Sequence, residues 1–189
     1  MDIKAARYTA EYPDDFVVFF IGMRINKLWR VHEWVPVMRT AFAMVKELKE
    51  MPDSPLLESR TMTSARDWRV PLFIQYWRSF DELEAWASNR DLRHRPAQTE
   101  FFRRTAFNGN VGVFHETFRV AAGEYEAIYA NMPRLLLASA GEYVPVRPSA
   151  SARDRMKAAR VAAKADQGAS ATPMPDRKAG SLTFQMKPS

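Results

Sequence analysis

The hydrophobic pattern changes its period within the first third of the chain. A continuous run of β-branched and aromatic residues from Phe16 to Ile25 predicts a strand that is buried on both faces. From Lys27 to Glu50 the apolar residues recur at intervals of three and four, which is the stripe of an amphipathic helix. Pro36 lies inside this stretch, so the helix either begins there or is kinked. The chain is therefore expected to start, after a polar segment, with a strand followed by a helix.

Two further strands are expected before the next helix. Residues 56–65 give a weak strand signal. The side chains from Trp68 to Trp77 alternate regularly between the two faces of an expected strand, which is a strong signal. Arg66 and Asp67 lie in the turn between these segments, and a hairpin is the simple interpretation. Pro71 has no backbone N–H for a ladder, which predicts an edge position or a bulge.

The middle of the chain predicts a second helix and a fourth strand. Ser79 and Glu82 have the spacing of a capping box, which begins a helix. Pro96 can start another helical piece in its first turn, and residues 108–110 end it. Residues 111–118 then have the composition of a strand.

The predicted order is the ferredoxin-like βαββαβ arrangement of an α+β fold. Helices cover one face of such a sheet, and the aromatic alternation makes its other face apolar as well. An apolar open face needs a cover, and a second copy of the chain is the simplest one. We therefore expect a homodimer in which two sheets face each other as a dimeric α/β barrel.

The charge is distributed unevenly along the 189 residues. Residues 147–189 hold nine of the 28 Lys and Arg residues but three of the 22 Asp and Glu residues. Residues 1–146 are therefore neutral, and we expect them to form the barrel domain, with 147–189 as a basic, flexible C-terminal tail. A basic alanine-rich helix from Arg153 to Ala165 that binds an acidic surface is the alternative for this tail. Because the body has no basic excess, we expect no nucleic-acid partner.

Several classes of protein are disfavoured by what the sequence lacks. It contains no cysteine, which excludes disulfides and thiolate chemistry. It has neither an apolar run near the roughly 18 residues of a membrane span nor a signal-like N-terminus, so we expect a cytoplasmic protein with no membrane partner. No zinc spacing or Ser-His-Asp pattern stands out, and seven glycines argue against a nucleotide-binding fold.

Two of the three histidines have settings that suggest chemistry. His94 lies just before Pro96, where a helix is expected to begin, and His115 lies within a predicted strand. Alternation puts His115 on the face opposite Glu116, so these two side chains should not touch. A helix and a strand meeting across one pocket could bring the two imidazoles together.

The chain resembles a family of monooxygenase-like proteins that includes a fumagillin-pathway polyketide monooxygenase. The resemblance covers about residues 10–145 and is carried by Phe16–Ile25, Tyr76–Phe80, His94–Pro96, Val113–Phe118 and Tyr129–Pro133. It implies the dimeric α/β barrel that the pattern of elements predicts independently.

A fainter similarity is to the haem-containing aldoxime dehydratases. Those enzymes carry a helix with Leu-Glu-x-Trp and a later histidine, followed by a strand with His-Glu. Here Leu83–Trp86 precedes His94, and His115 with Glu116 comes 21 residues after His94. The similarity implies that His94 is the axial ligand of haem b iron and that His115 is the distal acid–base. The distal arginine and serine of that family lie outside the match.

Each site residue also has a simpler interpretation. His94 could be a solvated histidine at a helix start, while Arg93 and Arg95 could meet haem propionates or an anionic substrate. His115 could be a hydrogen-bonded core histidine rather than a general acid–base. Five aromatic side chains would supply the walls of a substrate pocket, although core packing explains each one singly. They are Phe73, Trp77, Trp86, Phe101 and Phe114.

The sequence thus predicts an oxidative, monooxygenase-like enzyme that acts on a small apolar or aromatic molecule, with haem as its cofactor. A haem enzyme of the aldoxime-dehydratase type, acting on a C=N or N–O bond, is the near variant. A cofactor-free monooxygenase and a non-enzymatic binder of haem or another hydrophobic ligand are the alternatives from other classes.

Overall fold

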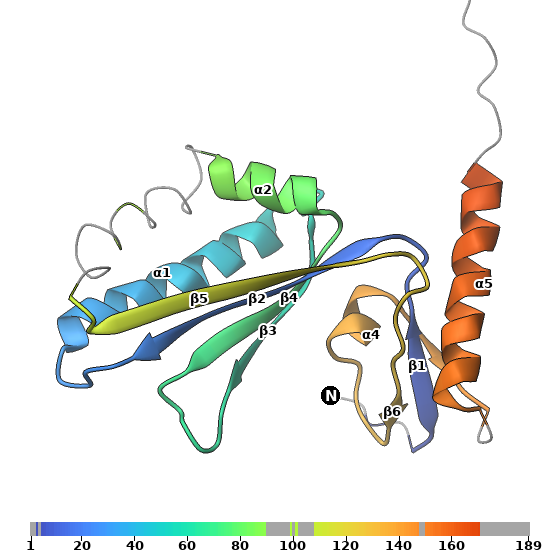
Figure 1. The fold of residues 1–189 in the computed structure, drawn as a ribbon, viewed down its shortest axis with the longest axis horizontal. Coiled ribbons are helices and arrows are strands. Elements are labelled where there is room, and N and C mark those ends of the chain that lie inside the picture. Colours follow the sequence, from blue (N-terminus) through green and yellow to red (C-terminus); the bar gives the residue numbers. More distant parts are fainter. Residues whose placement is uncertain are drawn as a thin grey trace, which may run out of the picture.

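Four antiparallel strands and two helices form the main body of the computed structural model, which describes residues 3, 5–89, 99, 101, 108–147 and 150–170. The strand order is β3-β4-β2-β5, and both helices lie over one face of this sheet (Figure 1). The elements are β2 (Phe16–Ile25), α1 (Val31–Glu50), β3 (Leu56–Thr63), β4 (Pro71–Trp77), α2 (Phe80–Ser88) and β5 (Val111–Val120). The predicted ferredoxin-like order is confirmed.

Strand β2 lies in the middle of the sheet and contributes apolar side chains to both of its faces. It pairs with β4 on one side and with β5 on the other, so that Phe19 lies opposite both Gln75 and Thr117. Val17 and Phe19 point toward the helices and join a buried cluster with Leu48 of α1. The continuous apolar run of the sequence is explained by this position.

The start of α2 confirms the capping box. Ser79 is the N-cap, and its side-chain oxygen accepts a hydrogen bond from the backbone N–H of Glu82 at 3.2 Å. The Ser79 hydroxyl also lies 3.2 Å from the Glu82 carboxylate. These bonds satisfy a backbone donor that the first turn of the helix leaves open.

Strand β4 corrects the position expected for Pro71. The strand begins at Pro71 rather than at Trp68, and it lies between β3 and β2 instead of at an edge. Pro71 is tolerated there because the first residue of a strand is one of the few positions where a missing N–H costs little.

A second, smaller lobe had no counterpart in the predicted elements. Its sheet has the order β6-β1-β7 and is accompanied by a short helix. Its elements are β1 (Arg7–Glu11), β6 (Tyr129–Ala130), α4 (Leu137–Ala140) and β7 (Glu142–Pro145). Leu137 and Ala138 are buried against Phe16 of β2, so this lobe covers one end of the sheet face that the helices leave open.

Helix α5 (Ala152–Ser170) lies within the segment expected to be a flexible tail. Its small residues Ala159 and Ala163 are buried, and Arg160 pairs with Glu124 at 2.7 Å. Gly123 has a φ of 75°, and a Cβ atom there would come within 2.6 Å of the Arg160 backbone. This segment therefore packs on the small lobe, while the division of the chain at residue 146 stays a prediction.

A buried carboxylate joins the start of α1 to the turn that leads into β5. Glu33 is 8% exposed and accepts hydrogen bonds from the side-chain amides of Asn110 at 2.9 Å and Asn108 at 3.1 Å. Arg30 contacts the other carboxylate oxygen at 2.9 Å. The hydrogen bond from Asn110 is the main reason that the pKa of Glu33 is lowered, and the second amide and Arg30 lower it further.

Within the described part of the chain, no helix is both long enough and apolar enough to cross a membrane.

We expect Gly22→Ala to destabilise the fold by about 1–3 kcal/mol, because the new methyl group would overpack the sheet. A Cβ atom at Gly22 would lie 2.6 Å from the Phe114 ring and 2.9 Å from Leu72 Cβ. Gly112→Ala is the matched control on the neighbouring strand, since its nearest contact would be 3.7 Å. Urea unfolding of both variants tests this, and equal midpoints would contradict it.

We expect Glu33→Gln to lower the melting temperature at neutral pH by roughly several degrees. Because the folded pKa of Glu33 is depressed, its contribution is present above the unfolded value of 4.5 and is lost as pH falls through the folded pKa. The difference from the natural chain should therefore shrink in acid. Glu50→Gln, on an exposed side chain of the same helix, is the control. A difference that stays constant down to low pH would show that the charge is not responsible.

Candidate active site

The strand β5 holds His115 on the face of the sheet that carries the helices. His115 lies opposite Ile21 of β2, and paired residues of neighbouring antiparallel strands share a face. Its ring lies 5.6 Å from the ring of Phe19, at an interplanar angle of 43°. Phe19 belongs to the buried cluster beneath the helices, so the imidazole has an aromatic floor.

The imidazole is accessible and has no fixed polar partner among the residues that the structure describes. His115 is exposed, and Val113, two residues earlier on the same face, is 51% exposed. β5 is an edge strand of the four-stranded sheet. Among the described side chains and backbone groups, none donates to or accepts from the His115 ring.

Glu116 points to the opposite face, as the alternation predicts, since it pairs with Phe20. It cannot orient the imidazole in the manner of a carboxylate–histidine pair.

Two of the predicted pocket residues form the core under this face. Trp77 is fully buried and Trp86 is 9% exposed, and their ring centroids are 5.4 Å apart. The Trp77 indole N–H donates to the side-chain oxygen of Gln75 at 3.0 Å. These side chains pack in the same cluster as Phe19, so they support the floor below His115 instead of forming an open wall.

The other three predicted pocket residues are dispersed. Phe73 makes an edge-to-face contact with Phe42 of α1 at 5.2 Å, and Phe101 packs against a separate cluster at the opposite end of the sheet, which contains Ile25. Phe114 lies on the face away from the helices, over Gly22. Phe114 and His115 therefore lie on opposite faces of the sheet, because adjacent strand residues point in opposite directions.

His94, Arg93 and Arg95 lie outside the described residues. The meeting of the two imidazoles therefore stays a prediction.

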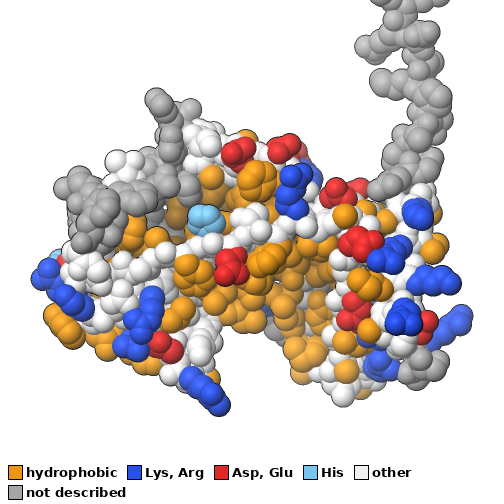
Figure 2. Space-filling view, viewed as in Figure 1, with side chains coloured by type: hydrophobic (Ala, Val, Ile, Leu, Met, Phe, Trp, Pro, Cys, Tyr) orange, Lys and Arg blue, Asp and Glu red, His pale blue; other side chains and the backbone are white. Residues whose placement is uncertain are grey.

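The face away from the helices forms a hollow beside the small lobe. Figure 2 shows hydrophobic side chains gathered between the two parts of the molecule, where the surface is indented. Phe20 and Phe118 lie on the face away from the helices with their ring centroids 5.7 Å apart, and Phe118 is 47% exposed. Burial raises the pKa of Tyr76, on the same face, to about 12, so its phenol is neutral at physiological pH.

A cavity of about 170 Å³ lies between α5 and the small sheet, with Thr9, Val144 and Arg155 among its lining residues. It includes none of the predicted site residues. Among the described residues, no group of three or more His, Asp or Glu side chains could hold a metal ion.

Two features of the site were not singled out in the sequence. Phe19 is part of an apolar run, and its contact with His115 depends on a strand register that joins residues almost a hundred positions apart. Glu33 is an ordinary acidic residue in the first turn of a helix until Asn108 and Asn110 are brought to it. Neither contact has a local sequence signal.

The fold is similar to that of several solved structures. An aldoxime dehydratase in complex with butyraldoxime has a TM-score of 0.57 and 19% identity, over 68% of this chain and 38% of that chain. A second aldoxime dehydratase has a TM-score of 0.55 and 19% identity, over 74% of this chain and 40% of that chain. This chain thus spans about two fifths of the length of either enzyme. At these identities the likeness shows the fold alone.

A third structure is a mutant form of SnoaB, a cofactor-independent oxygenase from Streptomyces nogalater. It has a TM-score of 0.40 and 10% identity, over 55% of this chain and 90% of that chain. This weaker likeness carries no argument about chemistry. No curated protein matches the sequence.

The sequence itself matches one family over most of the main body. Residues 16–137 match the family described as monooxygenase af470-like, a range that runs from the first residue of β2 to the start of α4. The match includes the strand with His115 and the whole ferredoxin-like unit. The chain belongs to the monooxygenase af470-like family.

Proposed function

We propose that the protein is a haem-dependent oxidative enzyme that acts on a small apolar or aromatic molecule. The observation that carries this proposal is the imidazole of His115, which is exposed above Phe19 with no polar partner among the described residues. An exposed imidazole on an apolar floor is suited to moving a proton to or from a bound molecule. Family membership supports oxidative or related chemistry.

A planar apolar cofactor on the helix side of β5 would lie against apolar side chains. Val113 is exposed beside His115, and neither Val113 nor Phe19 has a polar group that a macrocycle would leave unsatisfied. Haem, when bound, supplies a redox-active iron. By the resemblance to the haem-containing aldoxime dehydratases, His94 would bind the iron, and Arg93 and Arg95 would pair with the propionates.

In this proposal His94 would hold the cofactor and His115 would be the residue that moves a proton. Its imidazole gives a proton to the substrate, or takes one from it, at the atom whose bond is changing. The Phe19 ring, whose centroid lies 5.6 Å from that of the imidazole, supports one side of the His115 ring. The hydrogen bonds of Glu33 fix the turn from which β5 starts and so help to place the strand.

A haem enzyme of the aldoxime-dehydratase type is the second candidate. The order of Leu83–Trp86, His94 and His115 along the chain, which resembles the order in that family, favours it. The reaction would then be the conversion of an aldoxime, H–C=N–OH, to a nitrile and water: His115 would protonate the departing hydroxyl as the N–O bond breaks, and the imidazole left neutral would take up the proton released from the carbon.

We further propose that a second copy covers the hollow face of the sheet. Phe114, Phe118 and Met62 are 40%, 47% and 39% exposed on this face, which makes a contiguous apolar surface costly in water. Two such faces brought together would form the dimeric α/β barrel. Because His115 lies on the other side of the sheet, its accessibility does not depend on this contact.

The purified protein is expected to show a Soret band after loading with haemin. His94→Ala should abolish the band, whereas His115→Ala should keep it and lower turnover roughly 100-fold, the usual contribution of general acid–base catalysis. Absorption spectra and product formation from a panel of aromatic substrates and aldoximes measure these effects. His32→Ala, on an exposed side chain of α1, is the control.

A protein that takes up no haemin would rule out the haem proposal and leave a cofactor-free oxygenase. Full turnover in His115→Ala would remove the acid–base role, and haem uptake without turnover of any substrate would favour a carrier.

Phe118→Asp should convert the dimer into a monomer, because it would place a charge in an apolar contact. Sedimentation equilibrium is expected to show the dissociation constant raised by roughly 100-fold or more. Val161→Asp changes a comparably exposed side chain on α5 and should have no effect. If the natural chain sediments as a monomer at all concentrations, the proposed pairing is wrong.

A further inference from the structure

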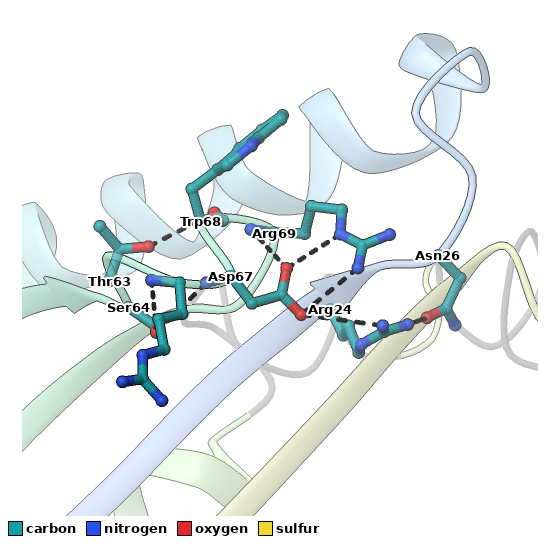
Figure 3. Close-up of polar contacts among 8 residues, drawn as sticks. Arg24, Asn26, Thr63, Ser64, Asp67, Trp68 and Arg69 are labelled. Atoms are coloured by element: carbon teal, nitrogen blue, oxygen red, sulfur yellow. Dashed lines mark hydrogen bonds and ion pairs between the residues drawn. The ribbon is translucent and has the colours of Figure 1, made fainter.

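Two loops meet at the end of the four-stranded sheet where α1 begins. Residues 26–30 join β2 to α1, and residues 64–70 join β3 to β4. The backbone N–H of Ile25 donates to the carbonyl of Arg69 at 2.9 Å, which ties the two connections together. Figure 3 shows the carboxylate of Asp67 between Arg69, at 2.9 Å, and Arg24, at 3.7 Å. We call these loops, with the flanking Arg24, Val31 and Thr63, the tryptophan tip.

The two most exposed tryptophans of the described chain lie in this tip. Trp29 is 74% exposed and Trp68 is 59% exposed, whereas Trp77 and Trp86 are buried in the core. Val31 is also 50% exposed. Large apolar side chains that stay exposed do not contribute the free energy of burial to the stability of the isolated protein. Clusters of such side chains mark contact surfaces.

The backbone around Trp68 is held by hydrogen bonds within its own loop. The conformation of this loop keeps the Trp68 side chain exposed. The Ser64 hydroxyl oxygen accepts from the backbone N–H groups of Arg66 and Asp67 at 3.2 and 3.3 Å. The Thr63 hydroxyl donates to the carbonyl of Trp68 at 3.3 Å. In Figure 3 the indole of Trp68 stands away from these polar contacts.

The tip is basic although the body of the protein is neutral. Segments 24–31 and 63–70 contain five Arg or Lys residues and one acidic residue, Asp67. Asp67 forms ion pairs with Arg69 and Arg24, and Glu33 forms an ion pair with Arg30. Lys27 and Arg66 are exposed at the surface, on the two different loops.

From these features we propose that the tryptophan tip binds the anionic headgroups of a membrane surface. Indole rings prefer the level of the headgroups, and neighbouring Lys and Arg residues are attracted by anionic lipids. A protein partner would need a pocket for an anchor residue and roughly 800 Å² of matching surface on each side. Two loops with separate exposed side chains are better suited to the headgroup layer of a lipid bilayer, which can deform around them. This contact lies on the surface of the bilayer and requires no spanning segment.

Sedimentation of the full chain with phospholipid vesicles tests this proposal. The chain should bind phosphatidylcholine vesicles that contain phosphatidylserine, bind vesicles without it much more weakly, and dissociate at high salt. Trp29→Ala combined with Trp68→Ala should reduce binding roughly tenfold, and Lys27→Glu combined with Arg66→Glu should reduce it at least as much. In the natural chain, vesicles should shift tryptophan emission to shorter wavelength, and the double Trp variant should lose this shift.

Val161→Ala on the basic helix α5 is the matched control, since its side chain is 60% exposed. Circular dichroism confirms that each variant is folded, which is expected because the changed side chains lie on the surface. Equal binding by the natural chain and the double Trp variant would assign the interaction to another basic segment and overturn the proposal. Retention on an acidic polypeptide without binding to vesicles would overturn it in favour of a protein partner.

Discussion

Strand β2 is apolar on both faces, and the rest of the structure depends on how each face is covered. On one face α1 and α2 bury Val17 and Phe19. On the other, the small lobe buries Phe16 at one end of the strand. The remainder of that second face has no cover among the described residues and carries exposed aromatic side chains. Since each residue of the strand faces one side or the other, this single strand separates the face that carries His115 from the exposed aromatic face.

The two faces of the sheet determine which side chains can contact each other. His115 and Phe19 share the helix side, whereas Phe114 and Phe118 share the other, although the three β5 residues lie within five consecutive positions. Gly22 allows the Phe114 ring to lie close against the sheet because no side chain occupies that place. The His115 side chain and the hollow face thus lie on opposite sides of the sheet.

Most of the main body can be predicted from local patterns, because its strands and helices are long and strongly periodic. The boundaries of β2 and the cap at Ser79 are examples. The small lobe cannot, because β1 has only five residues and its partners are more than a hundred positions away. Trp68 illustrates another limit of sequence patterns. Its alternation with later residues continues the strand pattern, but Trp68 lies in the turn, whose backbone is held by the hydrogen bonds of Ser64 and Thr63. At the candidate site, the alternation along β5 predicts the face on which His115 lies. The contacts of Glu33 cannot be predicted in this way, because Asn108 and Asn110 reach it only in the folded chain.

The arrangement of the small sheet has a consequence for how the protein can be divided. Its central strand, β1, comes from near the start of the chain, and β6 and β7 come from beyond residue 128. The family match begins after β1 and ends before β7. An expression fragment trimmed to those limits would delete the middle and one edge of a three-stranded sheet and uncover Phe16 and Leu137. The ferredoxin-like unit alone is therefore a poor choice of boundary for this chain, because segments from both sides of that unit pair with each other.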